Sequence, residues 1–289
     1  MENSKLQKRL SNFEQLEKYA QDFTEIYKSE KAKREDLKAS YNQLLKYAED
    51  LSETHSDLQM SNRELQKAYL DTIHRLVLAA EYKDEDTGDH IVRMSRYCAL
   101  VAEKSCLSEK EVQDILYASP MHDVGKIGIP DNILMKPGKL TDEEFETIKT
   151  HTTIGAKILA GSSSKILQLS QSIAITHHEK WNGKGYPQGI SKDKIPIEGR
   201  IVGLADVFDA LTSKRPYKDP YPVEVALDII KKERGEHFDP DVTDVFLKNI
   251  DEVLTIKEEV GTEEDINLSN LIRSERDVRG DVAAIGKKG

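Results

Sequence analysis

The chain has 289 residues, of which 38% are apolar and 33% are charged, and its formal net charge is −10. This length accommodates one large domain or two modest ones. The acidic balance disfavours a nucleic-acid polymer as the main ligand, and two cysteines are too few for a disulfide framework. Apolar runs such as residues 76–80 are far shorter than the roughly 20 residues that span a bilayer. Because the N-terminus also lacks the apolar segment of a signal peptide, we predict a cytoplasmic protein without a membrane span.

Residues 1–70 carry a seven-residue repeat typical of a coiled coil. The first glycine of the chain is Gly88, so no glycine or proline interrupts a helix before it. A polar a position such as Asn62 favours two parallel strands in one register. The d positions are leucine at five consecutive heptads, namely Leu37, Leu44, Leu51, Leu58 and Leu65. We therefore predict a parallel homodimer; the alternative is a long amphipathic helix docked on its own domain. The repeat continues to residue 79, so the helix should enter the next domain without a hinge.

Residues 71–253 have the pattern of a mainly helical globular domain. Apolar residues recur at spacings of three and four, and no stretch alternates strongly enough to require a sheet, so the predicted fold class is all-α. The predicted helical segments are residues 91–101, 112–118, 148–159, 166–175, 201–211 and 223–230. Residues 254–289 turn acidic and then rich in glycine and lysine, with few large apolar residues, which predicts a weakly ordered tail.

The domain also collects histidines and carboxylates. Any one of them has a plain structural explanation, since a single histidine is more often a hydrogen-bonded core residue than a metal ligand. Together, however, so many imidazoles and carboxylates on apolar helices would each need a buried partner, and one cluster of cations satisfies them all. Nitrogen and oxygen donors without thiolate suit iron, manganese or zinc in a multi-metal site. The residues concerned are His90, His122, Asp123, His151, His177, His178, Asp206 and Asp209.

Two of these motifs place neighbouring residues side by side. Consecutive residues on a helix point about 100° apart. His122 and Asp123 can therefore straddle a site, with the aspartate bridging two ions while the histidine binds one. The adjacent pair His177 and His178 can do the same from the opposite side.

Three long motifs resemble the HD-GYP subfamily of the HD superfamily of metal-dependent phosphohydrolases. Residues 122–131 have the sequence HDVGKIGIPD, residues 177–187 have HHEKWNGKGYP, and residues 206–218 have DVFDALTSKRPYK. The motifs occur in the family's order, and the resemblance covers residues 71–253. It implies an HD-GYP helical domain that hydrolyses the bacterial second messenger cyclic di-GMP to linear pGpG, with further cleavage to GMP left open.

The resemblance also implies the metal ligands. Asp86 stands four residues before the first histidine, where some members bind a third ion through glutamate, so two or three divalent ions are implied. The alternative for Asp86 is to cap the helix that starts near Gly88. Iron is the implied metal, with manganese as the alternative. The implied ligands are Asp86, His90, His122, Asp123, His151, His177, His178 and Asp206.

Nearby cations are expected to bind the substrate phosphates. Lys126 lies roughly one helical turn after Asp123, so both are expected in the catalytic mouth. Arg215 and Lys218 match family positions that contact phosphate, for which arginine offers a fork and lysine a point charge. For each of the three cations the alternative is a solvated surface charge.

The loop of Gly185, Tyr186 and Pro187 supplies a further candidate. Tyr186 is expected to stack on a guanine or to present its hydroxyl, although a structural turn would account for the glycine and proline alone. The family also uses this loop for contacts with partner proteins. Asp209, one turn after Asp206, is expected to orient metal ligands from behind.

Two other functions stay open at the level of sequence. The motifs report phosphodiester chemistry better than base identity, so cyclic GMP-AMP is an alternative substrate. A different class is a catalytically weak signalling adaptor that recruits partners through the GYP loop and the coiled coil. Because every ligand position is filled, the adaptor is the less favoured of these functions.

Overall fold

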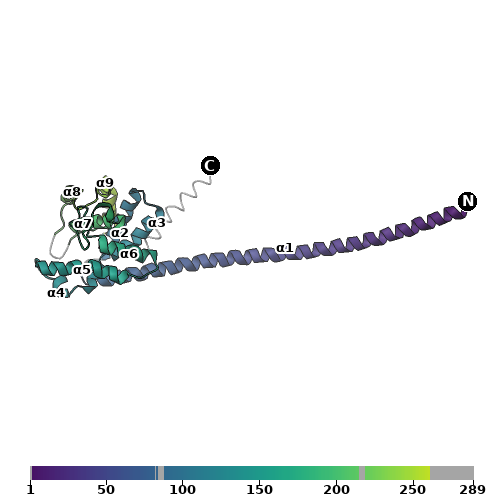
Figure 1. Ribbon diagram of the computed structural model, residues 1–289, viewed down its shortest axis with the longest axis horizontal. Coiled ribbons are helices and arrows are strands. Elements are labelled where there is room, and N and C mark those ends of the chain that lie inside the picture. The colour runs from purple at the N-terminus through teal and green to yellow at the C-terminus, as the bar shows by residue number, and fades with distance from the viewer. Residues whose placement is uncertain (1, 82, 84–87, 215–218, 261–289) are drawn as a thin grey trace. The chain divides into compact units, whose positions relative to one another are not determined.

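The computed structural model describes residues 2–81, 83, 88–214 and 219–260, which divide into two compact units after Gln66. Helix α1, Glu2–Glu81, makes up the first unit and runs without a break into the second (Figure 1). The other α-helices are α2 Gly88–Lys104, α3 Glu109–Ala118, α4 Asp131–Leu134, α5 Asp142–Leu159, α6 Lys165–Thr176, α7 Ile197–Thr212, α8 Val223–Lys232, α9 Pro240–Lys248 and α10 Ile250–Val260. Three short 3-10 helices are η1 Ser119–Met121, η2 Val124–Gly128 and η3 Lys192–Lys194.

The predicted all-α fold class is confirmed. Within the described ranges the chain forms no strand, and its one isolated bridge joins Arg234 and Phe238. Each segment that the three- and four-residue spacing marked as helical lies in or overlaps a helix, whereas α4, α9 and α10 were not predicted. Helix α10 also continues past residue 253 to Val260, which is buried. Residues 261–289 of the expected tail lie outside the described residues.

Helix α1 has different surroundings in its two parts. In the first unit its leucine repeat is exposed, with Leu37 71% and Leu51 70% accessible. In the second unit, Ile73 and Val77 are buried in one cluster with Leu159 at the end of α5. The end of α1 is therefore part of the globular core, although the repeat position Leu76 is itself 64% exposed. None of the described helices combines the length and the apolar character that crossing a membrane requires.

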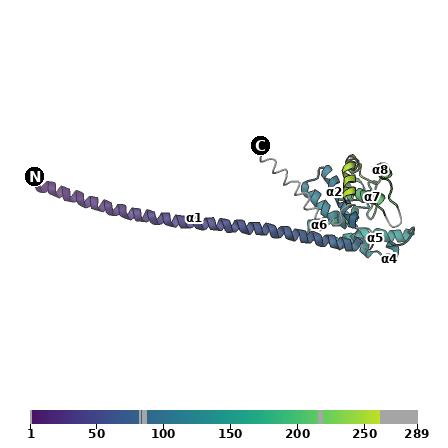
Figure 2. The ribbon, with the colours of Figure 1, turned by 180° about the vertical axis from the view of Figure 1, so that it is seen from behind.

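Helices α2, α6 and α7 lie together in the second unit, and α5 packs along α6 (Figure 2). A chain of edge-to-face aromatic contacts fills the core between α2, α7 and α9. The Tyr97 and Phe208 ring centroids are 5.7 Å apart, and those of Phe208 and Phe246 are 5.1 Å apart. All three rings are fully buried. This core fixes the positions of the helices that carry the predicted ligands.

The start of α5 is anchored by a capping box. The Thr141 side chain accepts a hydrogen bond from the Glu144 amide, and the Glu144 carboxylate accepts one from the Thr141 amide. The Lys136 ammonium also donates to both oxygens of that carboxylate, at 2.8 and 2.7 Å. These bonds therefore fix the direction of the first turn of α5, the helix that carries the candidate ligand His151.

Candidate metal centre

The structure brings seven of the predicted ligands together in two neighbouring groups. In each group, the potential ligand atoms lie within 4.8 Å of one another. The Asp123 group and the Asp206 group meet where His122 Nε2 lies 3.3 Å from Asp123 Oδ2. The Asp123 group contains Asp123, His151, His177 and His178, and the Asp206 group contains His90, His122 and Asp206.

Three of the histidines have their ring orientation fixed by their own helical turn. The Nδ1 atoms of His122, His151 and His177 lie 3.0, 2.7 and 3.1 Å from the carbonyl oxygens of Ser119, Ile148 and Ile173. A carbonyl oxygen can only accept, so each Nδ1 carries the hydrogen. In the neutral ring, Nε2 is then left with a lone pair that points away from the helix.

These lone pairs converge on carboxylate oxygens. Asp123 Oδ1 lies 3.2 Å from His151 Nε2 and 3.6 Å from His177 Nε2. Burial lowers the pKa of His177 and lowers that of His178 further, so both rings are neutral at pH 7. Neutral Nε2 atoms and carboxylates are all acceptors in this arrangement. A divalent cation satisfies such a cluster of acceptors, so the donor set fits metal ions.

Asp123 is charged and lies between the two groups. Burial opposes its ionisation, but the Lys126 ammonium outweighs that effect and holds the pKa of this carboxyl well below its usual range. Lys126 Nζ lies 2.8 Å from Asp123 Oδ2. Lys126 therefore lies beside Asp123, and its side chain is largely buried.

His90 is held by charged side chains. Its Nδ1 lies 2.8 Å from Asp209 Oδ2. Arg93 donates to both oxygens of the same carboxylate, at 2.7 and 2.9 Å. Burial opposes the charge on His90, yet the hydrogen bond to Asp209 and the nearby carboxylates raise its pKa. The same two donors, Arg93 and His90, keep the pKa of the buried Asp209 far below its usual range.

Arg93 was missed in the sequence. It lies one turn after His90 on α2, and its side chain is mostly buried. A cation at that spacing from a candidate ligand was a usable signal. It became interpretable only when folding brought Asp209 to it from 116 residues away.

A close backbone approach holds Asp123 next to His151. Gly125, two residues after Asp123, lies so near α5 that a Cβ atom there would overlap the His151 carbonyl oxygen and the Gly155 amide. Glycine is the residue that permits this approach. The 3-10 helix η2 can therefore press directly against the helix that supplies His151.

Tyr186 is also near the Asp123 group. Its ring centroid is 4.8 Å from that of His178, and its amide donates to the His178 carbonyl at 3.2 Å. Burial, together with the charges of Asp123 and Asp206, raises the pKa of the phenol, so its hydroxyl stays protonated.

Glu179 secures the loop that carries Tyr186, and it was not predicted. Its Oε1 accepts hydrogen bonds from the amides of Gln188 and Gly189, at 2.7 and 3.1 Å. Glu179 is 6% exposed. A glutamate directly after two adjacent histidines was a usable signal in the sequence. Its hydrogen-bond partners, however, depend on where the loop folds back in the tertiary structure.

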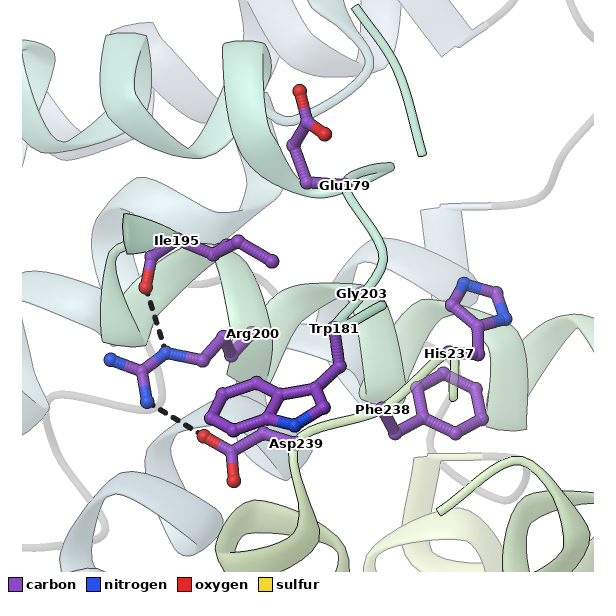
Figure 3. A pocket seen from close by; sticks show the side chains of 9 residues that line it. Glu179, Trp181, Ile195, Arg200, Gly203, His237, Phe238 and Asp239 are labelled. Atoms are coloured by element: carbon purple, nitrogen blue, oxygen red, sulfur yellow. Dashed lines mark hydrogen bonds and ion pairs between the residues drawn. The ribbon is translucent and has the colours of Figure 1, made fainter. Parts of the chain in front are cut away.

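A small pocket lies on the segment that follows the adjacent histidines (Figure 3). Arg200 donates to the Ile195 carbonyl and to Asp239 Oδ2 beside the indole of Trp181. The Trp181 amide also donates to the His237 carbonyl at 2.9 Å. These bonds fasten the segment to the start of α9. The lining residues are Glu179, Trp181, Ile195, Gly199, Arg200, Gly203, His237, Phe238 and Asp239.

Three predicted site residues lie outside the described residues. They are Asp86, Arg215 and Lys218. Their expected roles, as the ligand of a third ion and as phosphate contacts, stay predictions.

Comparison with known proteins places this site in a family. The family model described as "HD domain" matches residues 3–242. The chain belongs to the HD domain family. This membership and the relatives below confirm the resemblance to HD-GYP phosphodiesterases that the three motifs indicated.

Curated relatives of this HD domain chain carry cyclic-dinucleotide names. It is 49% identical over 178 residues to a cyclic di-GMP phosphodiesterase of Thermotoga maritima, covering 62% of this chain and 48% of that protein. It is 47% identical to a cyclic di-GMP phosphodiesterase response regulator of Xanthomonas campestris pv. campestris, with 62% and 47% covered. It is 43% identical to the 3′3′-cGAMP-specific phosphodiesterase 2 of Vibrio cholerae, with 65% and 36% covered. The chain thus spans about half or less of these relatives' length.

A solved structure supports the fold. The crystal structure of a cyclic GMP-AMP specific phosphodiesterase of V. cholerae matches with a TM-score of 0.50 at 20% identity. The match covers 71% of this chain and 53% of that one. At this identity the likeness concerns the helical architecture alone.

Proposed function

We propose that this protein is a metal-dependent phosphodiesterase that hydrolyses cyclic di-GMP to linear pGpG in bacterial second-messenger signalling. The observation that carries the proposal is the convergence on Asp123 Oδ1 of the His151 and His177 Nε2 atoms, whose rings already donate from Nδ1 to backbone carbonyls. The relatives' names supply the substrate class. Cyclic GMP-AMP is the second candidate substrate, because two of the similar proteins are named for it.

Two ions would be held by the two groups, with Asp123 between them. Iron is the metal we propose first, and manganese second. When bound, such ions activate water and offset the negative charge of a phosphodiester. The proposed ligands are His90, His122, Asp123, His151, His177, His178 and Asp206.

The chain's own residues position the substrate. Lys126 lies within 2.8 Å of Asp123 and is close enough to the ligand groups to neutralise a phosphate oxygen. Tyr186 keeps its proton and can donate it as a hydrogen bond next to His178. Arg215 and Lys218 are proposed to add phosphate contacts. Asp209 positions His90, which it contacts at 2.8 Å.

Turnover by metal-loaded protein tests the proposal. Protein purified without air and loaded with iron or manganese should hydrolyse cyclic di-GMP, and His122→Ala should abolish this activity. His55→Ala is the matched control, because His55 is exposed on α1. Equal turnover by His122→Ala and wild type would refute the proposed site. A higher kcat/KM for cyclic GMP-AMP would select the second substrate.

Metal content tests the number of ions. About two ions per chain in protein kept from air and chelators would make Asp86 a spectator. About three ions, with one lost in Asp86→Asn, would make Asp86 the ligand of the third.

We also propose that the first unit forms a parallel homodimer through its leucine repeat. The exposed Leu37, Leu51 and Leu58 would then be buried between two copies. Light scattering should give twice the chain mass for the wild type, and Leu44→Asn with Leu51→Asn should shift the protein to monomer. A wild-type monomer would favour the docked helix instead.

The adaptor function is tested separately. If His122→Ala loses turnover but still binds partner proteins, an adaptor role would remain in addition to catalysis.

A further inference from the structure

An exposed aromatic residue stands next to the Asp123 group. Phe145 lies in the first turns of α5 and is 45% exposed. Its ring centroid is 6.3 Å from that of Tyr186, with an interplanar angle of 81°. Tyr186 in turn lies at an angle of 32° to the His178 ring. The two aromatic side chains therefore form a corner that leads to the proposed metal ligands.

A lysine belongs to the same corner. Lys149 is one turn after Phe145 on α5, and its Nζ lies 5.0 Å from the Phe145 ring centroid and 5.5 Å from that of Tyr186. It also pairs with Glu146 at 2.6 Å, but that carboxylate is 70% exposed. An exposed ion pair of this kind is weak. The ammonium is therefore available for a stronger acceptor that enters the corner.

Single exposed aromatic residues are common on protein surfaces and need no special account. Phe145 differs because a second ring and a cation face the same space, next to a cluster of candidate ligands. The capping box at Thr141 and Glu144 fixes the turn from which Phe145 projects. The corner is thus preorganised, which lowers the entropy lost when a flat ligand binds.

We propose that Phe145, Tyr186 and Lys149 form the subsite for one base of the substrate and that Lys149 selects guanine. This inference rests on the proposed phosphodiesterase function. Nucleic bases stack on aromatic side chains whatever their identity. Guanine presents the acceptors O6 and N7 at one edge, whereas adenine replaces O6 with an amino donor. A lysine at the mouth of the corner can donate hydrogen bonds to guanine O6 and N7, whereas the amino group of adenine is itself a donor and disfavours the lysine.

The stacking role is tested by truncating Phe145. Phe145→Ala should weaken binding of a non-hydrolysable phosphorothioate analogue of cyclic di-GMP about 10-fold, as loss of one stacked base predicts. KM for cyclic di-GMP should rise by a similar factor, with a smaller change in kcat. Phe145→Trp should restore binding. Ile158→Ala is the matched control, because Ile158 is a large apolar residue on the same helix and is 50% exposed.

Base selection is tested at Lys149. Lys149→Ala should lower the ratio of kcat/KM for cyclic di-GMP to that for cyclic di-AMP about 10-fold, and Lys149→Arg should retain it. Unchanged analogue binding in Phe145→Ala, or an unchanged ratio in Lys149→Ala, overturns the inference while hydrolysis by the wild type stands. If the wild type hydrolyses no cyclic dinucleotide, the proposed function fails instead, and analogue binding by Phe145→Ala still decides whether the corner binds a base.

Discussion

The two ligand groups are held in place by different means. In the Asp123 group, His151 and His177 donate to carbonyl oxygens three and four residues earlier in their own helices. In the Asp206 group, His90 donates to Asp209, which comes from a helix 119 residues further along the chain. The difference teaches that the Asp123 group depends on local helix geometry, whereas the Asp206 group, in which His122 is also held locally, depends in addition on a tertiary contact between charged residues. A single distant substitution should therefore damage the second group selectively.

Replacing Asp123, which lies between the two groups, should impair both groups together and cause the largest loss of turnover. Asp123→Asn keeps the shape of the side chain but removes the charge that lies near both His122 and His151. We expect turnover to fall by more than about 100-fold, the upper range for changes behind a metal ligand. Elemental analysis should show that the ions proposed for both groups are lost. Asp228→Asn, at an exposed aspartate, is the control. If Asp123→Asn kept the ions of both groups, the bridging role would be contradicted.

Asp209→Asn should weaken metal binding by the Asp206 group alone. The amide keeps the size of the carboxylate but pairs poorly with Arg93 and His90, so the Asp206 group should lose metal affinity by about 10- to 100-fold. The Asp123 group should keep its affinity. A metal titration followed by calorimetry should show one weakened phase and one unchanged phase. Equal weakening of both phases would mean that the groups are not independently supported.

Glu179 tests whether the loop beyond the Asp123 group is held separately from its ligands. Glu179→Ala removes the acceptor of the Gln188 and Gly189 amides, which should lower the free energy of unfolding by about 1–3 kcal/mol. Metal content should be retained, and KM should rise several-fold because Tyr186 is less well placed. Glu179→Gln keeps an acceptor oxygen and should recover most of the stability in urea titrations. Loss of metal in both variants would show that the loop and the ligands are one unit.

His237 sharpens the comparison, because it is a partly buried histidine outside both groups. Burial lowers its pKa from 6.5 to about 4, and Lys180 contributes in the same direction. Between these values the unfolded chain binds a proton that the folded chain does not, so the free energy of unfolding falls as the pH drops from 6.5 toward 4. His237→Gln should remove about 1–3 kcal/mol of that fall. Urea titrations at pH 4.5 and 7.5, with His55→Gln as control, measure it; an unchanged slope would contradict the assignment.

The candidate ligands could be recognised in the sequence where two of them are adjacent residues. His122 with Asp123, and His177 with His178, stand together in the chain, and the structure brings these pairs into contact. Arg93 was missed because its carboxylate partner is 116 residues away. Glu179 was missed because its role depends on where the loop returns.

The sequence by itself determined most of the helices and the inventory of donors. Helical periodicity and the choice of side chains are local properties, so residues such as those of α5 and α7 could be assigned without tertiary information. Only the tertiary structure decided which donors face one another, which histidine lies against Asp209, and that Phe145 faces Tyr186. These outcomes depend on how the helices pack, because the Nε2 atoms that converge near Asp123 come from separate helices.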